Sequence, residues 1–485
     1  MNEQPSAPKS EHYDLVIIGA GPAGEKGAAQ AAYFGKRVCI IERAPKPGGA
    51  AVNTGTIPSK ALRESALYFS GMRSRGLHGV DYSIKRDITI ADFMYREREV
   101  IETEWALIDE NLRRHGVTVI QGSAHFVDAH TIEVARYKQE KRHITADVFL
   151  VASGSMPQRP AEVPFDDLVV VDSDSILKLP AIPKTMIVIG GGAVGCEYAS
   201  TFSALGTRVT LINARERLLM QLDAEISEAL EAQMTGRLGV QVLVDTHVTS
   251  IAIDDGYARV TLGDGTVLGA EVVLYSAGRQ GNTADLALHM AGVKTNSGGY
   301  IVVDEEFRTS VPHIYAAGDV IGYPQLASVA MEQARVAMCK AFDFRYKQRL
   351  APVLPYGVWT IPEVAMCGET EESARTKGLH YEIGKSSFVL NPRGQIIGDT
   401  EGFVKLIFRP EDQRLLGVSI VGEGACELIH IGASCMMSDG SIDFFIQSVF
   451  NYPALADVYK YAAYDGLQRL SKRVSGRTGL PTIGS

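Results

Sequence analysis

Three glycines near the start of the chain have the spacing of a site that binds a nucleotide diphosphate. They are Gly19, Gly21 and Gly24, in the segment GAGPAG. Between a strand and a helix, the first glycine allows a tight turn, the second lets backbone amides approach a pyrophosphate, and the third lets the helix pack on the strand. Glu42 follows eighteen residues after Gly24, where a carboxylate can accept hydrogen bonds from both ribose hydroxyls. The pattern predicts an adenine-dinucleotide site.

A second glycine set lies in the middle of the chain. The segment GGGAVG places Gly190, Gly192 and Gly195 in the same register as the first set. Because its context of apolar run, glycine turn and helix is equally good, this segment predicts a second dinucleotide site in the same chain.

The residue at the ribose position distinguishes the second site from the first. The apolar run after the second helix ends at Asn213 instead of an acid, and Arg215 and Arg217 follow. A carboxylate would repel the 2′-phosphate of NADP, whereas arginines would attract it. We therefore expect a site that accepts NADP(H) and need not exclude NAD(H). The alternative is that both arginines are solvated loop charges.

Two strand–helix–strand units must position these glycines. The first is expected as a strand over 13–19, a helix over about 22–35 and a strand over 37–42, and the second spans 185–213. From about residue 354 the chain alternates strands with helices rich in small residues. The sequence therefore predicts an α/β fold with two Rossmann-like dinucleotide-binding domains plus a C-terminal α+β domain. Residues 1–14 and 471–485 are expected to be tails.

Composition excludes several classes of protein. The net charge of −9 argues against a nucleic-acid binder, which usually carries a basic face. No apolar run approaches the roughly 20 residues of a membrane helix. The six cysteines are scattered without a CxxC pair, so we expect a reduced, cytoplasmic protein with no metal site.

Six motifs together resemble the flavoprotein disulfide reductases that bind two dinucleotides, such as lipoamide dehydrogenase and glutathione reductase. These motifs are GAGPAG, GTIPSK (55–60), VASGS (151–155), GGGAVGCEYA (190–199), YSAGRQGNT (275–283) and IYAAGDV (314–320). The resemblance implies FAD at the first glycine set and NAD(P)H at the second. It also implies a homodimer or a larger homo-oligomer.

The same resemblance implies a domain order in which one domain interrupts another. The FAD-binding domain would comprise residues 1–156 and 286–353, and the NAD(P)-binding domain residues 157–285. Residues 354–485 would form the dimerisation domain.

The resemblance also assigns roles to single residues. Asp319 would hold the ribityl chain of the flavin, and Lys60 and Glu197 would form an ion pair near flavin N5 and the nicotinamide. The remaining assignments are Arg43 and Gly154 to FAD, and Gly278 to NAD(P).

The chain departs from disulfide reductases at the positions that carry their chemistry. Ala51 and Thr56 stand where the family has its two redox cysteines, and no cysteine occurs from residue 45 to 75. Tyr452 occupies the position of the family's catalytic histidine. Asp457 occupies the position of the glutamate that orients this histidine. Because thiol–disulfide exchange needs a thiolate, and tyrosine titrates near ~10, neither half of that mechanism is available.

One branch of the family resembles the chain more closely, the soluble pyridine nucleotide transhydrogenases (Si-specific). The shared stretches include VVDSDSIL, LINARERLL, IYAAGDVIGYPQLAS and FNYPALAD. The resemblance implies ping-pong hydride transfer, in which NADPH reduces the flavin at N5 and NAD then takes the hydride. Ala51 and Thr56 would form a redox-silent floor, and Tyr452 of a partner subunit would plug the entrance used by disulfide substrates.

Three other functions fit the residues less well. An NAD(P)H:quinone or dye reductase on the same scaffold would differ only in its electron acceptor. A flavin-bearing sensor or assembly partner would have little reason to keep a complete second glycine set. A working disulfide or mercuric reductase would need the missing thiols.

Overall fold

The computed structural model describes residues 11–71, 90–136 and 140–478. Residues 1–10 of the predicted N-terminal tail lie outside these ranges, and the expectation of a tail is wrong for residues 11–14, which belong to the first strand, Glu11–Ile18. The chain divides into two compact units, which we describe separately. The first comprises Met1–Ala61, Met94–Arg159 and Gly278–Leu350, and the second comprises Leu62–Phe93, Pro160–Ala277 and Ala351–Ser485. The predicted division of the chain into domains stays a prediction.

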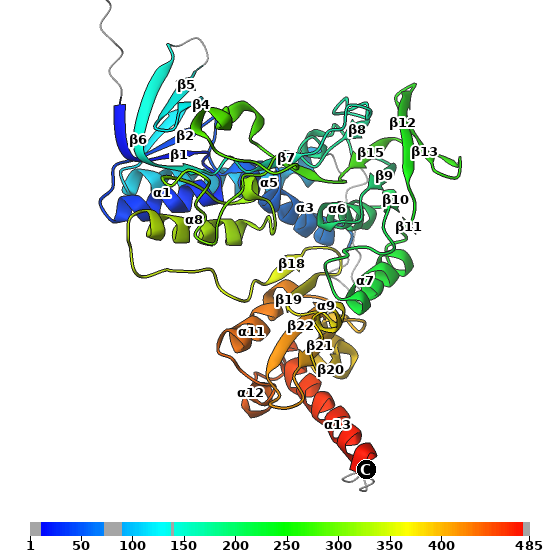
Figure 1. Cartoon of the computed structure of the whole chain (residues 1–485). Coiled ribbons are helices and arrows are strands. Elements are labelled where there is room, and N and C mark those ends of the chain that lie inside the picture. The colour runs from blue at the N-terminus through cyan, green and yellow to red at the C-terminus, as the bar shows by residue number, and fades with distance from the viewer. Residues whose placement is uncertain (1–10, 72–89, 137–139, 479–485) are drawn as a thin grey trace, which may run out of the picture. The chain divides into compact units, whose positions relative to one another are not determined.

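A seven-stranded sheet forms the centre of the first unit (Figure 1). Its order is β3 (Thr118–Gln121), β2 (Val38–Glu42), β1 (Glu11–Ile18), β6 (Arg142–Val151), β5 (Thr131–Ala135), β4 (Ser123–Asp128), with β17 (Ile314–Ala316) also on β6. Strands β3, β2, β1, β6 and β17 are parallel, with Ile17 opposite Ile40 and Leu150. The central strands are apolar on both faces because helices and loops cover both.

Small residues let the helices of this unit approach the sheet closely. Helices α1 (Pro22–Tyr33) and α8 (Ala327–Ala341) pack side by side (Figure 1), next to α5 (Tyr95–Arg114). A Cβ atom added at Gly27 of α1 would lie 2.8 Å from Leu150 and 3.5 Å from Ala334. The unit also contains α2 (Gly49–Asn53), the start of α3 (Thr56–Phe69), and a ribbon of β7 (Ser155–Pro157) and β16 (Arg279–Gly281).

The second unit contains a five-stranded parallel sheet around the second glycine set. Its order is β11 (Gln241–Leu243), β10 (Arg208–Ile212), β9 (Thr185–Ile189), β15 (Val272–Tyr275), β8 (Val170–Val171). Helices α6 (Ala193–Ala204) and α7 (Ala224–Gly236) belong to it, and an antiparallel sheet of β12 (Val248–Asp254), β13 (Tyr257–Leu262) and β14 (Val267–Ala270) follows.

The C-terminal part of the second unit is a five-stranded antiparallel sheet with helices. The order is β18 (Tyr356–Val358), β19 (Val364–Gly368), β22 (Leu415–Val421), β21 (Phe403–Phe408), β20 (Glu382–Ser387). Its helices are α9 (Glu371–Thr376), α10 (Pro392–Ile397), α11 (Ala425–Met437), α12 (Asp443–Gln447) and α13 (Val458–Thr478), and α4 (Ile90–Phe93) also lies in the second unit.

Helix α13 corrects the predicted C-terminal tail. The helix continues to Thr478, so the expectation of a tail from residue 471 is wrong for residues 471–478. Its first turns are anchored on β20, where a Cβ at Gly384 would lie 2.1 Å from the Ala462 carbonyl oxygen. Once a helix is anchored, each further residue adds a hydrogen bond at little cost, and 471–478 contains no proline to stop it.

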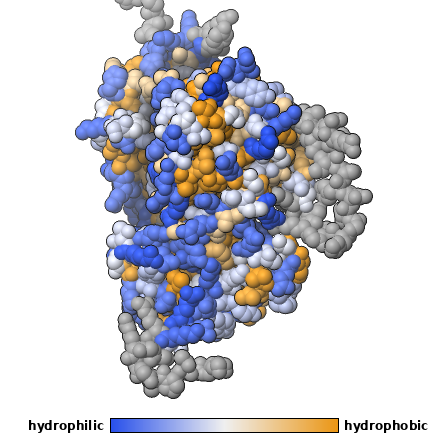
Figure 2. All heavy atoms as spheres, turned by 90° about the vertical axis from the view of Figure 1, so that its right-hand side faces the viewer, coloured by the Kyte–Doolittle hydropathy of each residue, from blue (hydrophilic) through white to orange (hydrophobic). Residues whose placement is uncertain are grey.

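The predicted fold class is confirmed. Both strand–helix–strand units are present with ends within two residues of the expected ones, and an α+β part follows. Among the described residues, no helix has both the length and the apolar composition required to cross a membrane. Figure 2 shows hydrophobic side chains in patches that hydrophilic ones separate.

Candidate functional site

The first glycine loop leads from β1 into the N-terminus of α1. Gly19 has φ +106°, and a Cβ there would lie 2.4 Å from the Ala152 carbonyl oxygen. A Cβ at Gly24 would lie 1.9 Å from the carbonyl oxygen of Gly19. Only glycine fits these two positions. At Gly21 a Cβ would meet nothing closer than Gly49 at 3.7 Å, so the backbone there is open to a ligand at the positive end of the helix.

Glu42 is held in place beside this loop. Its carboxylate accepts hydrogen bonds from the backbone amides of Ala20 and Ala44, both at 2.7 Å. These two bonds fix the orientation of the carboxylate and leave lone pairs on both oxygens. Arg43, the next residue, is exposed. The arrangement suits the hydroxyl pair of a ribose.

Asp319 belongs to a hydrogen-bonded group that the sequence alone did not identify. The Ser155 hydroxyl donates to its carboxylate at 2.7 Å, and Arg279 Nε donates to the same hydroxyl at 2.8 Å. Ser155 follows Gly154, and Arg279 follows Gly278. Ser155 and Arg279 lie in the motifs VASGS and YSAGRQGNT. Their place in these motifs was the only indication of a role that the sequence offered.

A cavity of about 410 Å³ in the first unit adjoins the glycine loop. Its lining includes Pro22, Gly48, Ala51, Thr56 and Ala327, and it contains no cysteine. Trp105 of α5 fixes α2, which carries Ala51, by donating from Nε1 to Asn53 at 2.8 Å. Ala51 and Thr56 therefore line a common space, and their role stays a prediction.

The thiols of the chain are buried. All six cysteines are buried, and none forms a disulfide. Burial raises the pKa of the Cys39 and Cys367 thiols to about 12 and that of Cys435 to about 11. Since the thiolate is the reactive form, these groups do not supply a redox relay.

Lys60 and Glu197 lie in different units. Lys60 is on α3, partly exposed, and its Nζ donates to the Ser59 hydroxyl at 3.2 Å. Glu197 is on α6 with 8% of its surface exposed, and its Oε1 accepts a hydrogen bond from the Trp359 backbone amide at 3.0 Å. Their pairing stays a prediction.

The second glycine loop repeats the geometry of the first. A Cβ at Gly190, where φ is +114°, would lie 2.7 Å from the Ser276 carbonyl oxygen, and one at Gly195 would lie 1.9 Å from the Gly190 carbonyl oxygen. A Cβ at Gly192 would meet no atom within 4 Å. The middle glycine of this loop therefore faces open space at the N-terminus of α6.

Asn213 organises the loop that follows β10. Its Oδ1 accepts from the Gly191 amide at 3.2 Å, and its Nδ2 donates to the carbonyl oxygens of Arg215 and Arg217 at 3.1 and 2.8 Å. An aspartate could not donate to these two carbonyls. The amide therefore shapes the loop and leaves position 213 uncharged.

The two arginines of this loop have different surroundings. Arg217 pairs with Glu372 at 3.1 Å and donates to the carbonyl oxygens of Met220 and Leu222. Arg215 is exposed. Arg217 is thus committed to holding the loop, which favours Arg215 as the residue that meets a ligand.

Tyr452 is 75% exposed and precedes the 3-10 helix Leu455–Asp457. Its predicted contact is with the site of a partner subunit, and that role stays a prediction.

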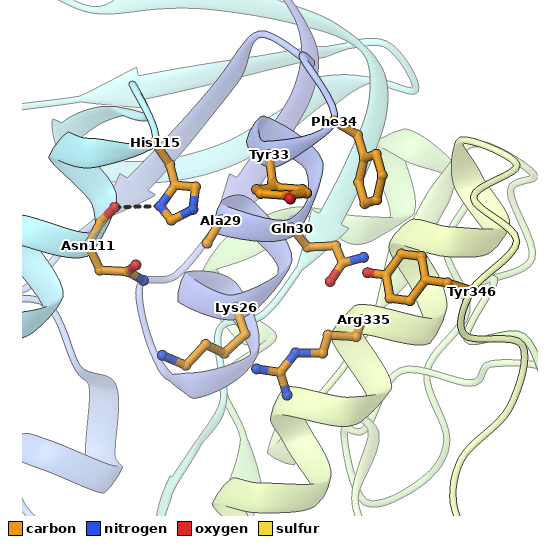
Figure 3. Close-up of a pocket in the computed structure, with 9 residues that line it drawn as sticks. All are labelled: Lys26, Ala29, Gln30, Tyr33, Phe34, Asn111, His115, Arg335 and Tyr346. Atoms are coloured by element: carbon orange, nitrogen blue, oxygen red, sulfur yellow. Dashed lines mark hydrogen bonds between the residues drawn. The ribbon is translucent and has the colours of Figure 1, made fainter.

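A second hollow, of about 470 Å³, lies near the C-terminal end of α1 (Figure 3). It is lined by Lys26, Ala29, Gln30, Tyr33, Phe34, Asn111, His115, Arg335 and Tyr346. His115 Nδ1 lies 2.8 Å from the Asn111 carbonyl oxygen. No residue of the predicted site lines this hollow.

Comparison with known proteins gives two family matches. A family model described as pyridine nucleotide-disulphide oxidoreductase matches residues 13–334, and the dimerisation domain of the same description matches residues 354–463.

Two of the similar curated proteins carry the same name. The soluble pyridine nucleotide transhydrogenase of Mycobacterium tuberculosis is 43% identical over 459 residues, which covers 94% of this chain and 98% of that protein. That of Colwellia psychrerythraea is 39% identical over 465 residues, covering 95% and 99%.

Solved structures show the same fold. LpdA from Mycobacterium tuberculosis has a TM-score of 0.86 at 28% identity, covering 94% of this chain and 99% of that one. A Cu(II) complex of the HOCl-induced flavoprotein disulfide reductase RclA from Escherichia coli has a TM-score of 0.83 at 26% identity, with the same coverage.

Proposed function

Because this chain belongs to the pyridine nucleotide-disulphide oxidoreductase family, we propose that it is an FAD-dependent transhydrogenase that moves hydride between NADPH and NAD. FAD, when bound, would accept the hydride from one nucleotide and return it to the other. The residues of the chain would bind the three dinucleotides, orient them and exclude other acceptors.

The first glycine loop fits FAD. The open backbone at Gly21 would accept the pyrophosphate at the N-terminus of α1, and the fixed carboxylate of Glu42 would hold the ribose. Asp319, oriented by Ser155, would hold the sugar-alcohol chain. Arg43 and Gly154 complete the proposed set.

The second glycine loop would take NADPH and NAD in turn. Gly190, Gly192 and Gly195 would receive the pyrophosphate, and Arg215 would attract the 2′-phosphate of NADPH. Because Asn213 is neutral and already bonded to the loop, its side chain does not repel that phosphate. Both nucleotides can therefore use one site, to which we also assign Gly278.

Lys60 and Glu197 would act at the hydride site. A lysine there would stabilise negative charge that accumulates beside it. A carboxylate would neutralise that lysine and orient the nicotinamide carboxamide. No acid or base of the protein is needed for the hydride itself.

One observation carries the choice of acceptor. Ala51 and Thr56 line the cavity where a redox disulfide would stand, and every thiol of the chain is buried. Electrons that reach this site have no thiol relay through which to leave. They must pass directly to a second small molecule, and the glycine loop around Gly192 provides a site for a second nucleotide.

The test is an acceptor comparison with purified, FAD-loaded protein. We expect rapid hydride transfer from NADPH to thio-NAD and slow reduction of menadione. Fast menadione turnover with slow thio-NAD transfer would overturn the proposal and support a quinone reductase, for which the 410 Å³ cavity offers space.

We also propose that the enzyme works as a cytoplasmic homodimer or a larger homo-oligomer. The match to a dimerisation domain over residues 354–463 supports assembly, and six buried cysteines without a disulfide suit a reducing compartment. The proposed domains are 1–156 with 286–353 for FAD, 157–285 for NAD(P), and 354–485 for dimerisation.

A further inference from the structure

The short loop 359–363 joins β18 to β19 and contacts the helix that carries Glu197. The Trp359 amide donates to Glu197 Oε1 at 3.0 Å, and the Ile361 amide donates to the Ser200 hydroxyl at 3.2 Å. Glu197 and Ser200 are three residues apart on α6 and so lie on the same face of that helix. Two backbone amides of this loop therefore fix α6 and the carboxylate of Glu197.

The same loop also holds α3. Arg63 Nε donates to the Thr360 carbonyl oxygen at 2.9 Å, and the Arg63 guanidinium pairs with Glu363 at 3.2 Å. Glu363 in turn accepts from the Cys426 backbone amide at 3.0 Å, at the start of α11. Lys60 precedes Arg63 by three residues on α3.

The middle of the loop and its ion pair with α3 are buried. The side chains of Arg63 and Glu363 are 3% and 9% exposed, and Thr360 and Ile361 are 0% and 2% exposed. Water cannot replace a lost partner in such a place, so each broken contact leaves an unsatisfied group. The loop therefore has one favourable position, and the two helices that it contacts are fixed relative to it.

We propose that loop 359–363 is a positioning element for hydride transfer, through which the C-terminal sheet sets the location of Glu197 and of the helix that carries Lys60. This inference rests on the proposed function, because it assumes that these two residues act at the hydride site. Ser200, Arg63 and Glu363 are then positioning residues. Hydride transfer is sensitive to displacements of about 1 Å, which can cost on the order of 100-fold in rate.

The decisive variant is Ser200→Ala, which removes the acceptor of the Ile361 amide. The matched control is Ser203→Ala on the same helix, whose hydroxyl donates to the Leu238 carbonyl oxygen at 2.7 Å and does not contact the loop. We expect Ser200→Ala to slow flavin reduction by NADPH roughly tenfold, and Ser203→Ala to leave it within about twofold. The dissociation constant for NADP should not change, since the glycine loop is untouched.

A second readout does not depend on turnover. The chain has two tryptophans, so in a Trp105→Phe background Trp359 reports on the loop alone. Adding Ser200→Ala should increase the quenching of Trp359 by acrylamide, and adding Ser203→Ala should not.

The buried ion pair offers an independent variant. Arg63→Met alone would leave Glu363 charged and unpaired, which can prevent folding. The double variant Arg63→Met/Glu363→Gln removes both charges and should fold. We expect it to slow flavin reduction and expose Trp359 as Ser200→Ala does.

The outcomes separate the two proposals. If the wild type transfers no hydride to thio-NAD, the proposed function fails, and the positioning role fails with it whatever the quenching shows. If the wild type is active and Ser200→Ala behaves as Ser203→Ala in rate, the loop proposal alone is overturned, with or without a change in quenching.

Discussion

At the scale of single residues, Arg215 and Arg217 differ in what they can do for a ligand. Arg217 is held by Glu372 and two carbonyl oxygens, whereas Arg215 is exposed at the bend of the same loop. The preference for NADPH should therefore depend on Arg215.

We expect Arg215→Gln to raise the KM for NADPH about 10- to 100-fold, because a hydrogen bond between charged groups contributes roughly 1.5–3 kcal/mol. The KM for NADH should stay within twofold. Steady-state kinetics with both donors measure this. Arg208→Gln, at the other end of β10, is the control and should change neither constant. An equal rise for both donors would contradict the assignment.

The buried thiols lead to a second prediction. Because burial raises the pKa of Cys39 and Cys367 to about 12, roughly one thiol in 10,000 is ionised at pH 8. Iodoacetamide at pH 8 should leave transhydrogenase activity unchanged. Ellman titration should detect almost no thiol in the native protein and all six in denaturant. Rapid loss of activity would show a thiol in the mechanism.

Sequence identified the residue types at the site better than their roles. The glycine sets could be found because a Cβ is impossible at Gly24 and Gly195. The sequence could not distinguish the roles of Arg215 and Arg217, because the difference depends on the contact of Arg217 with Glu372, more than 150 residues away. Ser155 was not identified for the same reason, since its partners Arg279 and Asp319 come from distant segments.

At the scale of elements, one lysine links the C-terminal antiparallel sheet to helix α7, which belongs to the part of the chain around the second glycine set. Lys405 of β21 is buried and pairs with Asp223 at 2.9 Å, with Glu225 at 3.2 Å and with Glu371. Asp223 caps α7, and Glu371 begins α9. The loop that carries Arg215 ends at this cluster.

The cluster predicts a defined pH range of stability. Burial lowers the pKa of Lys405, but its hydrogen bond to Glu371 and the charge of Asp223 outweigh burial, so the pKa is raised. Burial raises the pKa of Glu371, but the Lys405 hydrogen bond outweighs it, so that pKa is lowered. The stabilisation is therefore complete between about pH 5 and pH 10, the ordinary limits of the two groups. It is lost as pH falls through the lowered pKa of Glu371 or rises through the raised pKa of Lys405.

We expect Lys405→Met to lower Tm by about 4 °C at pH 7, since it leaves the buried Asp223 carboxylate without its ion pair at a cost of about 3–5 kcal/mol. The difference from wild type should shrink below about pH 4 as Glu371 becomes protonated. Differential scanning fluorimetry across pH measures both effects. Lys472→Met, an exposed lysine on α13, should leave Tm unchanged. A pH-independent difference would contradict the electrostatic explanation.

Elements were predictable where pattern and packing agree. The apolar run before each glycine set has to be a buried strand, so β1 and β9 were found. The last turns of α13 were not, because Ser471–Ser485 is polar and glycine-containing, and the anchor on β20 is not visible in the sequence. The ion pairs of Lys405 could not be predicted either, because its acidic partners lie on other elements.

At the scale of the whole molecule, the proposed assembly gives Tyr452 its role. Tyr452 and Val449 are 75% and 95% exposed in one copy, which is unusual for neighbouring large apolar groups and suits an interface between copies.

We expect Tyr452→Ala to accelerate dye and oxygen reduction several-fold, because opening the entrance plugged by the partner would admit other acceptors. Transfer from NADPH to thio-NAD should change little. Tyr257→Ala, a similarly exposed tyrosine on β13, is the control. Unchanged dye and oxygen reduction in a folded dimer would refute the plug.

The first unit is built from three separate segments of the chain, and this determines when it can fold during synthesis. The parallel sheet of the second unit is complete once Tyr275 has left the ribosome, and it can fold while the chain grows. The sheet of the first unit cannot be complete before β17 has been synthesised. Asp319 leaves the ribosome only after that strand. The proposed flavin site therefore stays incomplete until about two-thirds of the chain has been made. If the proposed flavin site is correct, we expect flavin to bind late in synthesis, and a translational pause before β17 is made would prolong the time in which β6 lacks this neighbour.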